Sequence, residues 1–337
     1  MSDRLSRYFS AHEFYLAIIV LVICLLIHFR SGQFFTANNI VNLLTSMIVP
    51  GMFAIGTHMA LVSGGIDVSF PALASLSIYA VTSFLVAREY SGSLLLPFLL
   101  VVALGALLGA FNGLLISRLT VHVLIITLGT ANIFRGIMQG ALDSVQISSL
   151  PASMKEFGEL KILTTTHPIS GRTASLPVSF LVLVAFFIIA QFVMRYMYFG
   201  RGIYAVGGDE IAARRAGFRP KTIKFWLYVF IGVIASVAGL VRMTSLGQVH
   251  PTNLLGTEIL VIAAVVLGGT AITGGRGSLG GAMLGTFLIV VVQNSMILLG
   301  IPTFWQRAAL GLLIVIGTGI GAVQRVRQRK EQRLVTP

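Results

Sequence analysis

Charged side chains are scarce in this sequence. Asp, Glu, Lys and Arg make up only 10% of the 337 residues, whereas 56% of the residues are apolar. An ordinary soluble domain carries about 25% charged residues. The composition therefore excludes a water-soluble globular protein and indicates a chain that lies largely in lipid.

Cysteine is almost missing, and histidine is not clustered. The single cysteine, Cys24, lies in the first apolar stretch, which excludes a disulfide framework and a cysteine-rich metal site. The six histidines, at positions 12, 28, 58, 122, 167 and 250, show no metal-ligand spacing. We therefore expect no metal in this chain, and only His58, inside an apolar stretch, merits a mutation.

Nucleotide-binding motifs are missing as well. No GxxxxGK[ST] phosphate loop occurs. Gly275, Gly277 and Gly280 have GxGxxG spacing, but no strand precedes them and no acidic residue follows about 20 positions later, as a dinucleotide site requires. We expect these glycines to allow close packing or a hinge, and we expect no cofactor in this chain.

What the sequence does contain is long apolar runs. A helix needs about 20 residues to cross a hydrocarbon core about 30 Å thick, and a helix satisfies its own backbone polar groups. We predict one all-α domain over 1–337, a polytopic bundle of about ten transmembrane helices. The expected spans are 14–29, 40–62, 67–87, 94–117, 119–140, 175–197, 222–243, 254–271, 278–299 and 304–323. The fifth and eighth contain Arg135 and Glu258, so we expect them to be broken or packed inside the bundle.

Lys and Arg are distributed unevenly over the predicted loops. With a cytoplasmic N-terminus, sixteen fall on the inner side and six on the outer side. Cytoplasmic loops are rich in Lys and Arg, so the distribution supports ten helices with both termini inside and a basic cytoplasmic tail at 324–337. The formal net charge of +13 then reflects membrane topology and predicts no nucleic-acid partner.

Two polar interruptions are long. The first, 141–174, faces outward in this topology, and a loop of this length suits the docking of a soluble partner. The second, 198–221, faces inward and is denser in charge. Within it, Gly207 and Gly208 predict a flexible break in the chain.

A short helix is expected directly after that break. Asp209 can cap a helix over 210–216, and Gly217 can stop it. Arg214 and Arg215 would project into the cytosol. Such a helix suits insertion into a groove on another protein; the alternative is a helix that lies at the lipid headgroups, which basic residues also favour.

These residues resemble a known family. Glu210, Ala212, Ala213 and Gly217 resemble the cytoplasmic coupling-loop signature of ABC importer permeases, in which a Glu, paired alanines and a glycine precede the ATPase docking site. Further blocks resemble the ribose-type branch of sugar importer permeases, in family order across nearly the whole chain. The blocks are SGGIDVSF at 63–70, ITLGTANIFRG at 126–136, GRGIYAVGGDEIAARRAGF at 200–218, AAVVLGGTAITGGRGSLGGAMLG at 263–285 and FWQRAALGLLIVI at 304–316.

The resemblance implies a non-catalytic permease subunit of a bacterial inner-membrane importer, with a monosaccharide or related sugar as the solute. It implies a second permease chain, like or unlike this one, two cytoplasmic ATPases that bind ATP and Mg, and a periplasmic solute-binding protein. Transport would proceed by alternating access. The sequence departs from the family at Phe70 and Pro71, at Asp209 and Glu210 where Asn and Pro are common, and over 141–174, which leaves the substrate open.

Three charged residues lie within the predicted spans. A charge at mid-membrane costs roughly 2.5 kcal/mol or more, so such side chains should face the bundle interior or a wet cavity. Asp67 is a candidate for the translocation path, or a cap at the start of the third helix. Glu258 is a second candidate, or one half of a buried strut with Arg135.

Neutral polar side chains supply the remaining path candidates. A passage for sugars should offer weak contacts that do not trap the solute. The candidates are Thr127, Thr130, Asn132, Thr270, Gln293 and Asn294. The alternative is that they form hydrogen bonds between helices.

Two other classes of protein fit the sequence less well. An ion-coupled secondary transporter would carry ion sites near the midplane, often in repeated halves, but acidic residues are few and no internal repeat is evident. A membrane enzyme would need a convergent set of acids, bases or metal ligands, and the sequence offers none. The basic inner helix at 210–216 distinguishes an ABC permease from both.

Overall fold

The computed structural model describes residues 11–143, 145–166, 171, 173–302, 304–306, 308–312 and 315. Its elements are, in chain order, α2 (Ala11–Ser31), α3 (Ala37–Val62), α4 (Phe70–Ala87), α5 (Leu95–Arg118), α6 (Val123–Gly140), α7 (Ala152–Glu159), β1 (Lys161–Thr166), β2 (Thr173–Pro177), α8 (Ser179–Tyr196), α9 (Tyr198–Gly208), α10 (Glu210–Arg215), α11 (Pro220–Leu246), α12 (Glu258–Leu267) and α13 (Leu279–Leu298). Helices therefore dominate, as expected for an all-α membrane protein.

Eight helices in the described part of the chain are long and apolar enough to cross a membrane: α2, α3, α4, α5, α6, α8, α11 and α13. Each corresponds to a predicted span, so the polytopic fold class is confirmed. The eighth predicted span, 254–271, holds only the 10-residue α12, which is the expected break. The tenth, 304–323, lies largely outside the described residues, as does the tail at 324–337.

The expectation for the fifth span was wrong. Helix α6 runs unbroken from Val123 to Gly140 and buries only a third of its residues. Arg135 is tolerated there because its guanidinium reaches Glu258 at the start of α12, with Nη2 and Oε1 3.3 Å apart. An ion pair between two helices therefore replaces the predicted break.

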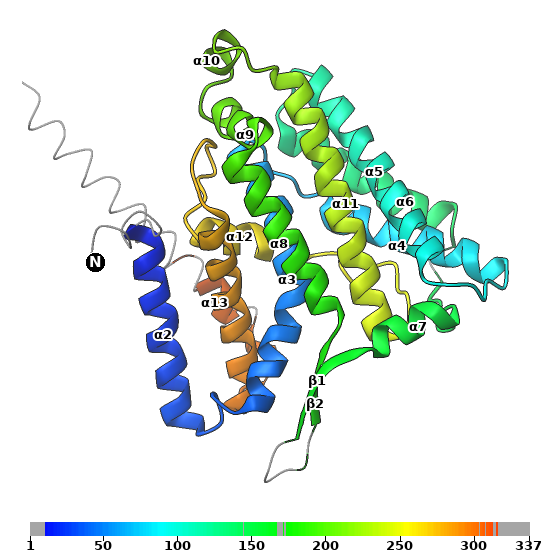
Figure 1. Cartoon of the computed structure of the whole chain (residues 1–337), viewed down its shortest axis with the longest axis vertical. Coiled ribbons are helices and arrows are strands. Elements are labelled where there is room, and N and C mark those ends of the chain that lie inside the picture. The colour runs from blue at the N-terminus through cyan, green and yellow to red at the C-terminus, as the bar shows by residue number, and fades with distance from the viewer. Residues whose placement is uncertain are drawn as a thin grey trace, which may run out of the picture.

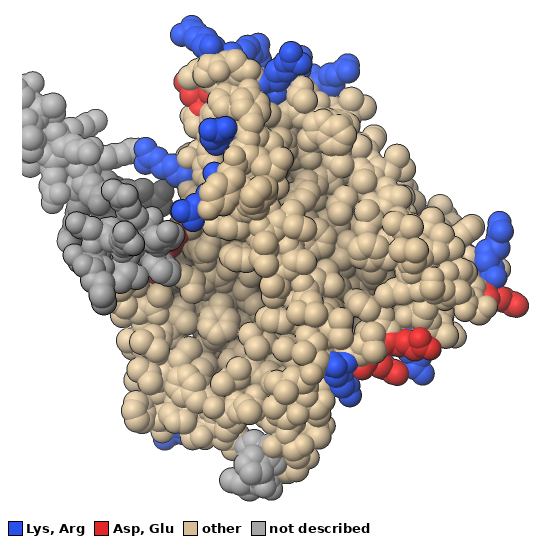
Figure 2. Space-filling model, viewed as in Figure 1, with Lys and Arg blue, Asp and Glu red and all other residues tan. Residues whose placement is uncertain are grey.

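The two ends of the bundle differ in charge. Helix α10 lies at one end, and the β1–β2 hairpin and α7 lie at the other (Figure 1). Lys and Arg gather over the α10 end, whereas acidic and basic side chains mix near the opposite end (Figure 2). By the positive-inside rule we expect the α10 end to face the cytoplasm. In that orientation the described part of the 141–174 loop would lie outside, so the predicted topology stays a prediction.

Helix α11 is central and packs against α5, α4 and α3. Its contact with α5 uses glycines four residues apart, which let two backbones approach closely. A Cβ added to Gly109 of α5 would lie 2.4 Å from the carbonyl oxygen of Tyr228, and one added to Gly232 of α11 would lie 2.2 Å from that of Gly105. The α5–α11 pair is therefore locked by backbone contact.

The outer polar segment contains the two strands of the described structure. Strand β1 pairs antiparallel with β2, from Lys161 opposite Pro177 to Thr166 opposite Thr173. Ala174 and Leu176 of β2 are buried against Val41 of α3, and Thr45 Oγ1 of α3 donates a hydrogen bond of 3.3 Å to the Ser175 carbonyl. The hairpin is thus fixed to the outer half of α3.

The α5–α11 contact predicts opposite effects for the same substitution at two helical glycines. Gly109→Ala should destabilise the protein by about 1–3 kcal/mol, the usual range for an overpacked core. Gly129→Ala in α6 adds a Cβ with nothing within 4 Å, so it should be neutral or stabilising because Ala favours helix. The monodisperse fraction that survives heating in detergent measures both; equal survival of the two variants would contradict the close contact.

Candidate functional site

The inner loop contains a short capped helix, as predicted. Asp209 leaves helical geometry (φ −160°, ψ 110°), and its Oδ1 accepts hydrogen bonds from Ile211 N and Ala212 N at 2.8 and 3.0 Å. At the other end, Gly217 adopts φ +88°, and the amide of Phe218 donates to the Ala213 carbonyl at 3.0 Å. This is the glycine-based C-terminal stop of a helix.

Helix α10 presents both charge and an apolar side chain to solvent. Glu210 pairs with Lys224 of α11 at 2.5 Å and with Arg214 at 3.7 Å. Arg215 is exposed, and Ile211 is 68% exposed. Ala213 is buried beneath them. The outer face of α10 can therefore make apolar and ionic contacts with another protein.

The predicted flexible break at Gly207 and Gly208 is wrong. Helix α9 includes both glycines and ends at Gly208, with Asp209 as its C-cap. Gly207 is instead a point of close backbone contact, because a Cβ there would lie 1.8 Å from the carbonyl oxygen of Val62 at the end of α3. A Cβ on Gly208 would meet nothing within 4 Å.

Three chain segments meet at this point, which we call the inner junction: Gly64, Gly207 and Gly274 with Gly275. The amide of Gly275 donates to the Val62 carbonyl at 2.8 Å. A Cβ on Gly274 would lie 2.5 Å from the Gly207 oxygen and 2.8 Å from Gly64 Cα. Gly64, Gly274 and Gly275 all have positive φ, which glycine adopts without strain. The junction therefore joins α9 to the end of α3 and to the α12–α13 loop.

A tyrosine reinforces the inner junction. Tyr204 of α9 donates its hydroxyl to the Gly277 carbonyl at 2.9 Å. Burial, and secondarily the negative charge of Glu13, raises the pKa of Tyr204 above its ordinary value, so the phenol stays protonated as the donor at neutral pH. Close packing of Gly275 and Gly277 was expected and is confirmed; a Cβ on Gly280 would meet no atom within 4 Å.

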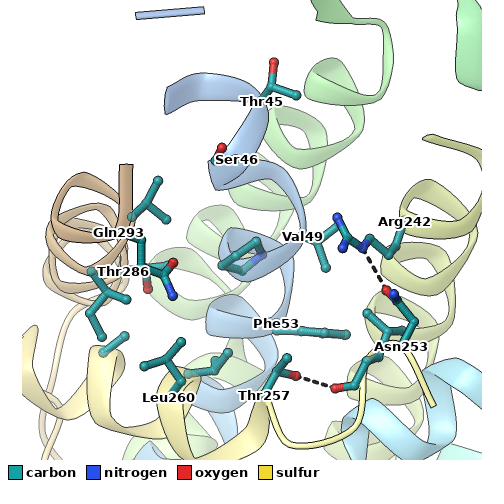
Figure 3. Close-up of a pocket in the computed structure, with 16 residues that line it drawn as sticks. Thr45, Ser46, Val49, Phe53, Arg242, Asn253, Thr257, Leu260, Thr286 and Gln293 are labelled. Carbon is teal, nitrogen blue, oxygen red and sulfur yellow. Dashed lines mark hydrogen bonds between the residues drawn. The ribbon is translucent and has the colours of Figure 1, made fainter. Parts of the chain in front are cut away.

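A cavity of about 290 Å³ lies in the outer half of the bundle, between α3, α11, α12 and α13. Figure 3 shows Thr45, Ser46 and Phe53 on α3 in the middle, between Gln293 and Thr286 of α13 on one side and Arg242 of α11 on the other; the Phe53 ring extends toward Asn253. The loop before α12 closes one side with Asn253 and Thr257.

The cavity wall combines an aromatic ring, neutral hydrogen-bonding groups and one guanidinium group, that of Arg242. Arg242 Nε donates to Asn253 Oδ1 at 3.0 Å, and Thr257 Oγ1 donates to the Leu254 carbonyl at 2.7 Å. Among the described residues, the lining includes no carboxylate. Such a wall can bind a polar solute through hydroxyl, amide and guanidinium contacts on an apolar background.

Of the predicted path residues, the structure places Gln293 at this cavity. The sequence reasoning missed Thr45, Ser46, Arg242, Asn253 and Thr286. A signal existed for the first two, because Asn42, Thr45 and Ser46 are spaced for one face of an otherwise apolar helix. Asn253 lies in a loop, where the sequence alone does not show which way a side chain points.

Several other candidates have structural partners. Asp67 Oδ1 accepts hydrogen bonds from Ser69 N and Ser69 Oγ at 2.7 and 2.6 Å. These bonds form a local turn before α4, so the predicted cap by Asp67 is wrong: the N-cap position of α4 is Ser69, and no side chain caps the helix there. Thr127 is buried and its hydroxyl contacts the Ile66 carbonyl and the Val68 amide, at 3.2 and 3.3 Å. Glu258 forms the strut with Arg135.

The remaining candidates lie apart from the cavity. Thr130 Oγ1 donates within α6 to the Thr127 carbonyl at 3.3 Å. Thr270 Oγ1 lies 2.9 Å from Nδ1 of the fully buried His58, near the inner junction. Asn132 is exposed on α6 and donates to the Leu128 carbonyl of its own helix. Asn294 is half-buried on α13 and is not among the cavity-lining residues.

A lipid-spanning helical bundle with a polar outer cavity and a capped basic helix at its inner end defines a multi-pass membrane transport subunit. Residues 39–317 match the family described as the branched-chain amino acid transport system permease component. The chain belongs to this family, and it is a multi-pass protein of the bacterial inner membrane.

Individual relatives cover nearly the whole chain. The ribose import permease protein RbsC of Escherichia coli (strain K12) is 30% identical over 300 residues, 89% of this chain and 90% of the relative. RbsC of Bacillus subtilis (strain 168) is 32% identical over 304 residues, 90% of this chain and 89% of the relative. The autoinducer 2 import system permease protein LsrC of Yersinia enterocolitica is 31% identical over 310 residues, 90% of this chain and 82% of the relative. No solved structure matches the chain.

These matches confirm the resemblance to the ribose-type branch of ABC importer permeases and give no support to an ion-coupled secondary transporter.

The inner junction predicts a difference between adjacent glycines. Gly207→Ala should loosen the junction, because the new methyl group meets backbone, whereas Gly208→Ala should not. A steric clash that costs about 1–3 kcal/mol raises the fraction of molecules in which the inner junction is open at least about fivefold. Trypsin cleavage after Arg214 or Arg215 in inside-out vesicles should accelerate accordingly in the first variant. Equal cleavage rates in the two variants would rule out the steric constraint.

Proposed function

We propose that this chain is the membrane-spanning subunit of a binding-protein-dependent importer that carries a monosaccharide or related sugar. The relatives named for ribose and autoinducer 2 import support a sugar-type substrate. The cavity supports it too, since Thr45, Ser46, Thr286 and Gln293 offer neutral hydrogen-bonding groups, and a passage for a polyhydroxyl solute needs weak contacts of this kind.

The assembly in this proposal adds three kinds of component to this chain. A second permease chain, like or unlike this one, completes the passage. Two cytoplasmic ATPases hold ATP and Mg, because this chain has no phosphate loop. A periplasmic binding protein delivers the sugar to the outer face, where the 141–174 segment lies.

The observation that carries the proposal is the inner junction. Helix α10, through α9 and Gly207, is in backbone contact with the ends of α3 and the α12–α13 loop. Helices α3, α12 and α13 also form the cavity wall. A displacement of α10 by an ATPase would therefore reach the cavity through rigid contacts.

The mechanism follows from this connection. With the ATPases apart, the cavity would be closed to one side of the membrane; when ATP draws the ATPases together, α10 would move and α3 would reorient relative to α13. This is alternating access by movement of packed helices.

The proposal is tested at α10. Arg214→Glu with Arg215→Glu should reverse the charge of the docking face, so that the ATPase no longer co-purifies in mild detergent and sugar uptake into vesicles falls to background. The protein should stay in the membrane, because both side chains are exposed. Arg201→Glu is the matched control, since Arg201 is an exposed inner arginine outside α10.

An intact wild-type chain that co-purifies with neither an ATPase nor a binding protein would overturn the proposed function. Unchanged uptake in the double variant would remove α10 from the coupling role.

The cavity is tested separately. Gln293→Leu removes an amide from the wall, so sugar uptake should fall about tenfold, the usual range for one or two lost hydrogen bonds. Asn132→Leu should leave uptake unchanged, because Asn132 is exposed on α6, away from the cavity. Initial uptake rates in reconstituted vesicles compare the two variants. If Asn132→Leu lowered uptake and Gln293→Leu did not, the translocation path would lie along α6 instead of through the cavity.

A further inference from the structure

A second pocket, of about 400 Å³, lies at the cytoplasmic end of the bundle. Its walls are the segment that links α5 to α6, the first turns of α11, and one side of α10. We call it the basic pocket. It is separate from the outer cavity, and the two have no described lining residue in common.

The basic pocket carries an excess of positive charge. Arg118, Arg214, Lys221 and Lys224 line it, together with one carboxylate, Glu210. That carboxylate lies 2.5 Å from Lys224 and 3.7 Å from Arg214. Arg118 and Lys221 have no ion-pair partner among the described residues and are exposed. The pocket is therefore complementary to an anion.

The surface beside the basic pocket is apolar. Leu114 at the end of α5, Leu119 and Val121 in the linking segment, and Ile125 at the start of α6 are all exposed. Leu119 and Val121 also line the pocket. A ligand with both a charged and an apolar part fits this arrangement better than a free ion does.

Aromatic side chains mark the depth of the pocket in the membrane. Trp226 lies five positions after Lys221 on α11 and is exposed, as is Tyr198 at the start of α9. Exposed Trp and Tyr concentrate at the level of the lipid headgroups. The start of α11, and with it the basic pocket, therefore lies at the headgroup level of the inner leaflet.

We propose that the basic pocket binds the headgroup of an anionic phospholipid, with the phosphate between Arg118 and Lys221 and the acyl chains along Leu114, Leu119, Val121 and Ile125. Basic pockets between transmembrane helices on the cytoplasmic side bind anionic headgroups in other membrane proteins. Because Arg214 and Glu210 of α10 share the pocket, the lipid would contact the helix on which an ATPase is proposed to dock.

The experiment is a native mass-spectrometric titration of the full chain in detergent with phosphatidylglycerol and with phosphatidylcholine of the same acyl chains. The wild-type chain should bind phosphatidylglycerol more tightly. Arg118→Gln with Lys221→Gln should weaken that binding roughly fivefold for each charge removed and leave phosphatidylcholine binding unchanged. Inorganic phosphate should not compete at equal concentration, because it lacks the apolar part.

Two controls keep the result interpretable. Arg201→Gln with Lys155→Gln removes the same number of charges outside the pocket and should keep the preference. Arg118→Lys with Lys221→Arg preserves the charge and should keep it too, which separates loss of charge from loss of fold. The proposal is overturned if the wild-type chain shows no preference for phosphatidylglycerol, or if the variant with both glutamine substitutions keeps that preference. It is also overturned if that variant loses a bound ATPase while its lipid binding stays intact.

Discussion

The contact of Gly207 with the carbonyl of Val62 is the constraint on which the rest of the structure depends. A methyl group at position 207 would lie 1.8 Å from that oxygen, so the end of α9 and the end of α3 are in direct backbone contact. Gly275 adds a hydrogen bond to the same carbonyl. Because Gly207 packs against this carbonyl and Gly275 donates a hydrogen bond to it, the polar inner loop and the cavity wall form one mechanical unit, and flexibility at this point would disconnect them.

Much of the fold could be predicted from the sequence, for a physical reason. Hydrocarbon accepts only apolar side chains and internally bonded backbone, so runs such as α5 and α8 are recognisable without tertiary information. The α10 helix was also predictable, because the cap at Asp209 and the stop at Gly217 are local signals. The Arg135–Glu258 strut was one of two alternatives that the cost of a buried charge left open.

The cavity could not be predicted in the same way. Its wall is assembled from α3, α11, α12, α13 and a loop, and no local pattern says which polar side chains of separate helices converge. Thr127 and Thr130 have the chemistry expected of a path but form hydrogen bonds with neighbouring backbone. The role of Gly207 was misjudged for a related reason, since a glycine that permits close approach and one that permits bending look identical in a sequence.

The ion pair between Glu210 and Lys224 ties α10 to a second element besides α9. Lys224 is on α11, the helix locked by glycine contacts against α5. A load applied to α10 therefore divides between two routes, one through the inner junction toward α3 and α13, the other through α11 toward α5. A movement of α10 would thus be transmitted to two parts of the permease. The relative stiffness of the two routes would determine whether the cavity wall bends or the whole bundle turns.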